Sequence, residues 1–147
     1  MSDTSAPAPE RPLVVVADPI HPAGRERLAA RFAVAYLPEM ADEAARREAL
    51  AAAEALVVRV FRVDDALLHA APRLRLVAKH GSGVDNIDIP EATLRGVMVA
   101  NTPGANSTAV AEGAVALMLA VQRQIRLMDA CVRENRFDER WRLTLRE

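Results

Sequence analysis

The stretch KHGSGVDNIDIPEATLRGVMVANTPGAN, residues Lys79–Asn106, decides the fold. It contains two glycine-bearing turns on either side of one short helix and one short strand. Asp88 has the residue type of an N-cap, Glu91 follows it by three positions, and Gly96 ends the segment. This spacing is typical of a helix with a capping box and a glycine terminator. The stretch therefore predicts a strand–helix–strand unit.

The same alternation extends upstream. Apolar runs predict strands at residues 13–19, 33–38, 55–60, 74–80 and 97–101, and helix-forming segments lie between them at 21–32, 40–54, 64–72 and 88–96. Strands that alternate with helices at this spacing indicate right-handed crossovers and a parallel sheet. The strands are almost continuously apolar, which is typical of a sheet covered on both faces. The sequence thus predicts an α/β fold with a five-stranded parallel sheet and helices on both faces.

Composition excludes several classes of protein. The 147 residues suit one ordinary domain, and the net charge of −1 gives no support to a nucleic-acid or anionic-membrane partner. No apolar run reaches the roughly 20 residues of a membrane span. Cys131 is the single cysteine and fits a reducing compartment. We expect a cytoplasmic protein whose residues 1–12, rich in Pro, Ser and Ala, form a disordered tail.

The segment 107–147 differs from the rest of the chain. Apolar residues recur every three or four positions from Ser107 to about Val132, which predicts one continuous helix. About 26 helical residues would span about 39 Å, more than a domain of this size covers. We therefore divide the chain into an ordered domain at 13–106 and a helical segment at 107–147, whose polar tail has two apolar anchors, Phe137 and Trp141.

In an open parallel sheet, ligands bind at the carboxyl ends of the strands. The residues predicted at this edge are Asp18, Arg59, 79–84 and 101–107. The Gly81–Gly83 turn can direct its backbone N–H groups outward, an arrangement that binds carboxylate or phosphate. Arg59 and Lys79 add positive charge. The alternative is a tight strand-to-helix connection with surface cations.

Other chemical signatures are weak or absent. Asn106 and Ser107 precede the long helix, where they would cap it or face a ligand. His80 is the histidine that borders the glycine turn. We find no spacing that predicts a metal site, no catalytic triad and no Gly-x-Gly-x-x-Gly.

The segment KHGSGVDNIDIPEATLRGVMVANTPGANSTAVAEGAVALMLA, residues 79–120, resembles the N-terminal half of the NAD-dependent D-2-hydroxyacid dehydrogenases, particularly those of phosphoglycerate-dehydrogenase type. The resemblance implies a flavodoxin-like substrate-binding domain. It also implies that the long helix leads into a Rossmann cofactor domain absent from this sequence. The catalytic Arg, Glu and His of the family would lie beyond Glu147, so no catalytic residue is assigned.

The resemblance also implies roles for individual residues. The backbone amides around Ser82, Gly83 and Val84 would bind the substrate carboxylate. Ser82 would in addition contact the cofactor, and Ser107 would face the nicotinamide.

Arg59 and Lys79 match basic positions that contact a distal phosphate in phosphoglycerate-type members. Two departures bear on the substrate. Val60 replaces a frequent serine, so phosphoglycerate is only weakly supported, and Gly113 stands where many members have a bulkier residue.

We therefore interpret the chain as the substrate-binding portion of an NAD-dependent D-2-hydroxyacid dehydrogenase that acts on a small 2-hydroxy or 2-keto acid. By itself the chain should be inactive and bind NAD weakly. The apolar stripe of the helix 107–132 predicts a homodimer, with Leu117 and Val121 near the two-fold axis.

Two alternatives belong to other classes. One is a non-enzymatic binding or interaction module derived from the same family. The other is a response-regulator-like protein with Asp18 as phosphoacceptor, which would need an acidic cluster that residues 19–22 do not provide.

Overall fold

A computed structural model describes residues 11–142. They fall into two units, one extending to Ala105 and one beginning at Asn106. Most of the predicted N-terminal tail, and the side chain of Trp141 with its predicted anchoring role, lie outside the described part.

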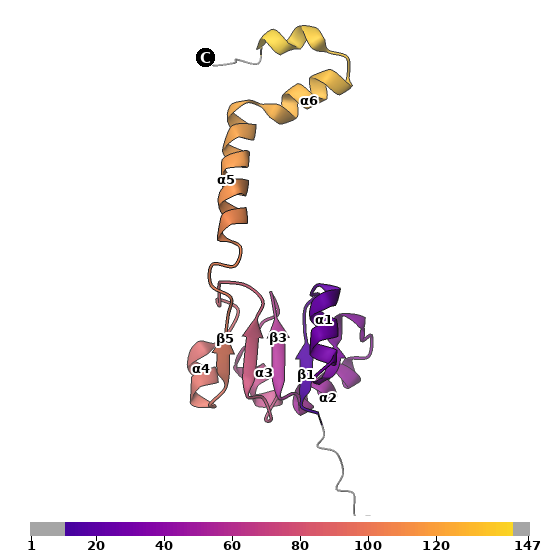
Figure 1. Cartoon of the computed structure of the whole chain (residues 1–147), viewed down its shortest axis with the longest axis vertical. Helices are drawn as coiled ribbons and strands as arrows, with labels where there is room; N and C mark the ends of the chain where they lie inside the picture. The colour runs from indigo at the N-terminus through magenta and orange to yellow at the C-terminus, as the bar shows by residue number, and fades with distance from the viewer. Residues whose placement is uncertain (1–10, 143–147) are drawn as a thin grey trace, which may run out of the picture. The chain divides into compact units, whose positions relative to one another are not determined.

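The first unit is built on a parallel five-stranded sheet (Figure 1). Its strands are β1 (Leu13–Val16), β2 (Ala33–Tyr36), β3 (Ala55–Val58), β4 (Leu76–Lys79) and β5 (Met98–Ala100). Their order in the sheet is β2-β1-β3-β4-β5, and each neighbouring pair is parallel. The predicted α/β fold class is confirmed.

Short helices connect the strands, and aspartates begin three of them. The helices are α1 (Pro22–Ala29), α2 (Glu43–Ala52), α3 (Asp65–Ala70) and α4 (Ile89–Leu94), with a 3-10 turn at Leu37–Glu39. Asp42, Asp64 and Asp88 each accept a hydrogen bond from a backbone N–H in the first turn of the helix that follows. Gly96 ends α4 in the left-handed region, with φ of 69°. The predicted cap at Asp88 and the terminator at Gly96 are confirmed. The predicted capping box is not completed, because the Asp88 N–H donates to the Val63 carbonyl and the Glu91 carboxylate accepts from Arg95.

The two faces of the sheet differ in how fully they are covered. Leu50 of α2, Leu68 of α3 and Ala92 of α4 pack in one cluster with Leu56 and Val77 of the central strands. A right-handed crossover from β1 to β2 places α1 on the opposite face. On that face the side chains of β3 and β4 are half-buried, and Met98 on β5 is 68% exposed. Burial is therefore deepest on the side of α2, α3 and α4.

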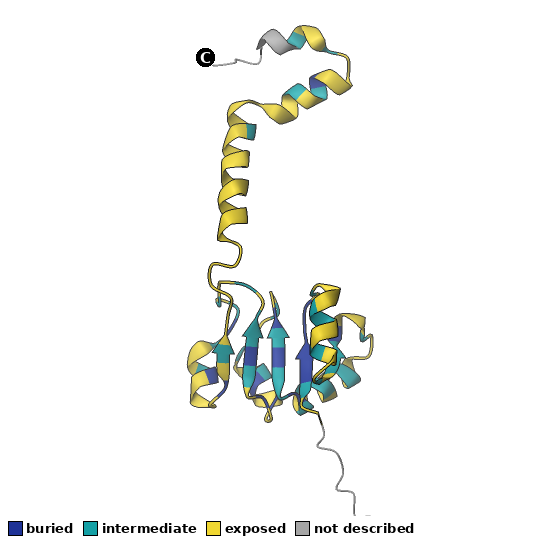
Figure 2. Ribbon diagram, in the orientation of Figure 1, coloured by how far each residue is buried: buried dark blue, intermediate teal, exposed yellow. Residues whose placement is uncertain are grey.

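The second unit consists of α5 (Ser107–Gln122), α6 (Ile125–Arg133) and a 3-10 helix (Phe137–Arg142). No residue of α5 is buried, as Figure 2 shows, whereas Cys131 of α6 is buried. None of the helices formed by residues 11–142 has the length and apolar character to cross a bilayer.

The prediction of one unbroken helix to about Val132 was wrong. Gln124 adopts a left-handed conformation, with φ of 49° and ψ of 38°, and separates α5 from α6. A non-glycine residue in this region costs about 1–2 kcal/mol, so the backbone cannot continue as a regular helix through it. Val121 and Ile125 keep helical spacing across the break, which is why the apolar pattern did not reveal it.

The burial of β3 leads to a test of stability with two matched leucines. Leu56 is 1% exposed and Leu94 is 82% exposed. Leu56→Ala should lower the free energy of unfolding by about 2–5 kcal/mol because it leaves a cavity in the core. Leu94→Ala should change it by less than about 0.5 kcal/mol. Urea denaturation followed by circular dichroism measures both, and equal losses would contradict the assigned core.

Candidate functional site

The carboxyl ends of the parallel strands bring several loops to one edge of the sheet. Asp18 follows β1, residues 59–61 follow β3, residues 80–86 follow β4, and Asn101 and Thr102 follow β5. This edge contains the residues that the sequence predicted as a binding site, apart from Ser107.

Asp18 holds the loop after β3. Its Oδ2 atom accepts hydrogen bonds from three consecutive backbone N–H groups: those of Arg59 at 2.6 Å, Val60 at 3.1 Å and Phe61 at 2.9 Å. The residue is only 7% exposed. A buried carboxylate needs such donors, because an unpaired buried charge is very costly. These contacts assign Asp18 a structural role, and the phosphoacceptor alternative loses its support.

Lys79 and Asn86 contact the same loop from its carbonyl side. The Lys79 ammonium donates to the carbonyl oxygen of Arg59 and to Asn86 Oδ1. The Asn86 Nδ2 group donates to the carbonyl oxygen of Phe61 at 2.6 Å. Lys79 is half-buried, whereas the Arg59 side chain is exposed and makes no ion pair with another residue in the range 11–142.

The glycine turn after β4 is fastened to the loop after β5. The Gly81 N–H donates to Thr102 Oγ1 at 3.2 Å, and the Thr102 N–H donates to the Gly81 carbonyl at 3.1 Å. Ser82 Oγ donates to the Thr102 carbonyl at 3.1 Å, while Asn101 Nδ2 donates to the Ser82 carbonyl at 2.8 Å. These four contacts orient the backbone of residues 81–82.

Gly83 and Val84 present backbone N–H groups at this edge. Neither N–H group donates a hydrogen bond to an acceptor among residues 11–142, and Gly83 is exposed. Two neighbouring N–H groups of this kind can bind the oxygens of a carboxylate. The structure thus brings the predicted residues Arg59, Lys79, Ser82, Gly83 and Val84 to one edge of the sheet.

The two glycines of the turn differ in backbone conformation. Gly81 has a positive φ of 150°, whereas Gly83 does not have a positive φ. Residues with a side chain rarely adopt this conformation, so position 81 favours glycine. At Gly83 a Cβ atom would instead lie 3.1 Å from Asp85 Oδ2.

Ser107 is the first residue of α5 and belongs to the second unit. Asn106 occupies the N-cap position, but its side chain makes no capping hydrogen bond, so the capping expected of it is not formed. The contact of Ser107 with a cofactor stays a prediction.

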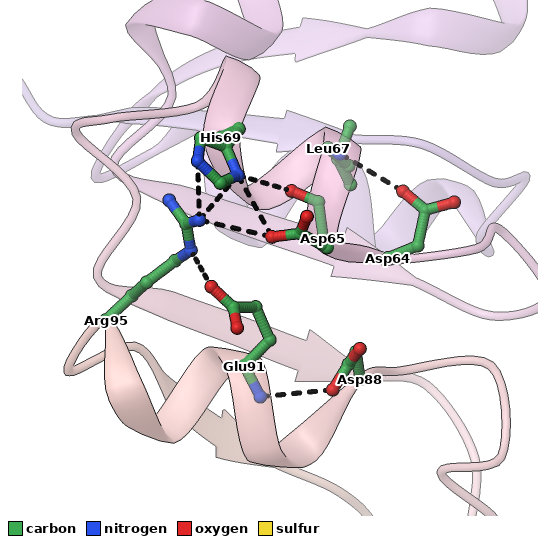
Figure 3. A network of polar contacts seen from close by, with 7 residues as sticks. All are labelled: Asp64, Asp65, Leu67, His69, Asp88, Glu91 and Arg95. Carbon is green, nitrogen blue, oxygen red and sulfur yellow. Dashed lines mark hydrogen bonds and ion pairs between the residues drawn. The ribbon is translucent and has the colours of Figure 1, made fainter.

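A second polar cluster joins α3 to α4 (Figure 3). His69 Nδ1 lies 2.9 Å from Asp65 Oδ1, and Arg95 Nε donates to Glu91 Oε1 at 2.6 Å. Another Arg95 nitrogen, Nη2, donates to Asp65 at 3.2 Å and also contacts the His69 ring. The ligand atoms of Asp65, His69 and Glu91 lie within 4.8 Å of one another.

Sequence reasoning overlooked this cluster. Asp65 and His69 are four residues apart on a helix, which was a readable signal, but Glu91 comes from another helix. The Arg95 guanidinium already supplies a cation to these three groups. The cluster therefore works as a partly exposed ion-pair network between two helices, of a kind that contributes about 0–1 kcal/mol for each exposed pair.

The two glycines of the turn provide a matched test. Gly81→Ala should lower the free energy of unfolding by about 1–3 kcal/mol, because a side chain there is forced into a conformation that is essentially restricted to glycine. Gly83→Ala should cost less than about 1 kcal/mol, since Gly83 lies outside the left-handed region and the Asp85 side chain can rotate away. Urea denaturation of both variants measures the difference, and the reverse order would refute the assigned turn geometry.

Comparison with known proteins places these features in a wider context. The sequence profile described as "D-isomer specific 2-hydroxyacid dehydrogenase, catalytic domain" matches residues 14–135. The D-3-phosphoglycerate dehydrogenase of Mycobacterium tuberculosis is 42% identical over 128 residues, which cover 84% of this chain and 24% of that protein. The glyoxylate reductase of Thermococcus litoralis is 52% identical over 81 residues, which cover 54% of this chain and 24% of that protein.

Solved structures agree in fold. The NADPH-dependent glyoxylate/hydroxypyruvate reductase of Sinorhizobium meliloti, in complex with NADP and malonate, superposes with a TM-score of 0.75 at 30% identity. The match covers 88% of this chain and 41% of that one. The chain thus spans about a quarter of the length of the curated relatives named above.

Proposed function

Because the chain belongs to the D-isomer specific 2-hydroxyacid dehydrogenase family through its catalytic domain, we propose that it binds the carboxylate of a small 2-hydroxy or 2-keto acid. In the whole enzyme, a hydride would pass between C2 of the 2-hydroxy acid and NAD. The hydroxyl proton would pass to a base outside these 147 residues. The contribution of this chain is to hold and orient the substrate.

The observation that carries the proposal is the pair of N–H groups at Gly83 and Val84. They adjoin Ser82, whose carbonyl and hydroxyl are both engaged by the loop after β5. The loop is therefore already ordered when a ligand arrives, so binding costs little conformational entropy. Hydrogen bonds from N–H groups to a charged carboxylate are also stronger than those between neutral groups.

Arg59 is the residue that we propose for long-range attraction of the anionic substrate. Arg59 is exposed at the same edge, and its guanidinium would contact a distal phosphate of the substrate. Lys79 was expected to share that role, but its ammonium is engaged by Arg59 and Asn86. A phosphate-bearing substrate would therefore depend mainly on Arg59.

NAD would supply the hydride acceptor, and the residues present fit only part of it. Ser82 would contact the nicotinamide end, while the cofactor contact of Ser107, which belongs to the second unit, stays a prediction. The 147 residues contain no Gly-x-Gly-x-x-Gly to receive the pyrophosphate. We therefore propose that these residues by themselves bind NAD weakly and do not catalyse the reaction.

A titration of the isotopically labelled chain with D-lactate tests the carboxylate site. The amide signals of Gly83 and Val84 should shift with a dissociation constant on the order of millimolar, as suits a ligand of so few atoms. D-lactamide, which has an uncharged amide in place of the carboxylate, should produce no comparable shift. NADH should leave the signals of Gly83 and Val84 largely unchanged.

Two variants control this titration. Gly83→Val should abolish the shifts, because its branched side chain occupies the approach to the loop, while Gly113→Ala should preserve them, because a Cβ atom at Gly113 meets nothing within 4 Å. Equal shifts with D-lactate and D-lactamide would exclude carboxylate recognition at this loop.

We further propose that α5 and α6 mediate a homodimer. Leu117 and Val121 of α5 and Leu127 of α6 line an open groove of about 540 Å³, with Gln124 at the helix break. Val121 is 78% exposed. Burial of an exposed apolar side chain of this size contributes roughly 1.5–3 kcal/mol, so a two-fold contact of this face would be stabilising.

Two valines of α5 distinguish a specific dimer from non-specific hydrophobic association. Val121→Glu should convert the dimer to a monomer at protein concentrations of tens of micromolar, because it places a charge in the contact. Val115 is also exposed but lies about 120° around the helix at 3.6 residues per turn, so Val115→Glu should leave the dimer intact. Light scattering measures the mass, and a monomeric unsubstituted chain would exclude this assembly.

A further inference from the structure

The tripeptide Arg59–Phe61 is held from both sides of its backbone. Asp18 accepts hydrogen bonds from all three of its N–H groups. On the other side, the Lys79 ammonium donates to the Arg59 carbonyl and the Asn86 amide donates to the Phe61 carbonyl. An anion thus contacts the hydrogens of these peptide groups while a cation contacts a carbonyl oxygen. Hydrogen bonds arranged in this way polarise and strengthen one another.

Lys79 and Asn86 also lie at the two ends of the loop formed by residues 80–85, which we call the substrate loop. Residues 80–85, which include Gly83 and Val84, lie between them, and the Lys79 ammonium donates directly to Asn86 Oδ1. The backbone of Asn86 is fixed as well, since its carbonyl accepts from the Val63 N–H at 2.8 Å. Both ends of the loop are therefore attached to each other and to the same tripeptide.

We propose that Asp18, Lys79 and Asn86 form a loop clasp whose task is to position the amides of Gly83 and Val84. These three are positioning residues, and Lys79 acts on the substrate through the loop rather than as a direct ligand. The functional purpose of holding this loop rests on the proposed function, in which the amides of Gly83 and Val84 bind the substrate carboxylate. The clasp itself is a property of the ligand-free chain.

The decisive measurement is nitrogen-15 relaxation of the ligand-free chain and of Lys79→Met, which keeps an unbranched apolar stem of similar length but lacks the terminal ammonium. The order parameters of Gly83 and Val84 should fall from about 0.85, the value of rigid backbone, to below about 0.6. The matched control is Arg62→Met, which removes an exposed cation whose ion pair among residues 11–142 is with Asp64, at 3.5 Å. It should leave these order parameters unchanged.

Asp18 and Asn86 provide independent arms. Asp18→Asn retains one oxygen acceptor but no charge, and hydrogen exchange at Val60 and Phe61 should accelerate about tenfold or more, because hydrogen bonds to charged groups are the stronger ones. Asn86→Ala keeps the backbone contact with Val63 and should lower the order parameters of the loop as Lys79→Met does. It serves as the test if Lys79→Met fails to fold.

Unchanged order parameters in folded Lys79→Met would overturn the proposal, and a loss of D-lactate affinity in that case would identify Lys79 as a direct ligand. Lower order parameters support the clasp whatever the ligand does. If they fall while the unsubstituted chain gives no shift with D-lactate, the clasp stands and the proposed function fails.

Discussion

One buried carboxylate organises the candidate site. Asp18 follows β1 and sits where the loop after β3 turns three backbone N–H groups toward the protein interior. At the end of a strand these groups have no partner in the sheet ladder, so they need an acceptor from elsewhere. The carboxylate supplies that acceptor, and the N–H groups in turn compensate for burying its charge. The carboxylate and the three N–H groups therefore satisfy one another's hydrogen-bonding needs.

From Asp18 the polar contacts continue across the edge of the sheet in strand order. The loop after β3 connects through Lys79 and Asn86 to the ends of the loop after β4. That loop connects through Ser82 and Thr102 to the loop after β5. Side-chain hydrogen bonds thus hold the loops together beyond the point where the backbone hydrogen bonds of the sheet end. A binding site composed of backbone N–H groups benefits from such support, because its geometry cannot be set by side-chain rotamers.

The network of Asp65, His69, Glu91 and Arg95 contrasts with this arrangement. It is partly exposed, it joins two helices rather than the strand ends, and its charges are shared among groups that water also reaches. Solvent screening makes such contacts weak. At the Asp18 site, by contrast, burial makes the loss of one partner expensive. The Asp18 site therefore differs from the network of Asp65, His69, Glu91 and Arg95 mainly in its burial, and not in the number of its charged groups.

The sequence by itself determined the strand and helix alternation, the cap at Asp88, the terminator at Gly96 and the edge of the sheet where the glycine turn lies. These features depend on local residue types or on apolar spacing, and both can be identified directly in the sequence. The family resemblance was also readable, because its glycine turn and the Asn-Thr-Pro turn lie within one continuous segment, residues 79–106. Only the tertiary structure decided that Lys79 donates to Arg59 and Asn86, that Asp18 holds residues 59–61, and that Gln124 breaks the long helix. The first two are contacts between residues brought together by neighbouring strands, and the third is a single backbone conformation that apolar spacing cannot report.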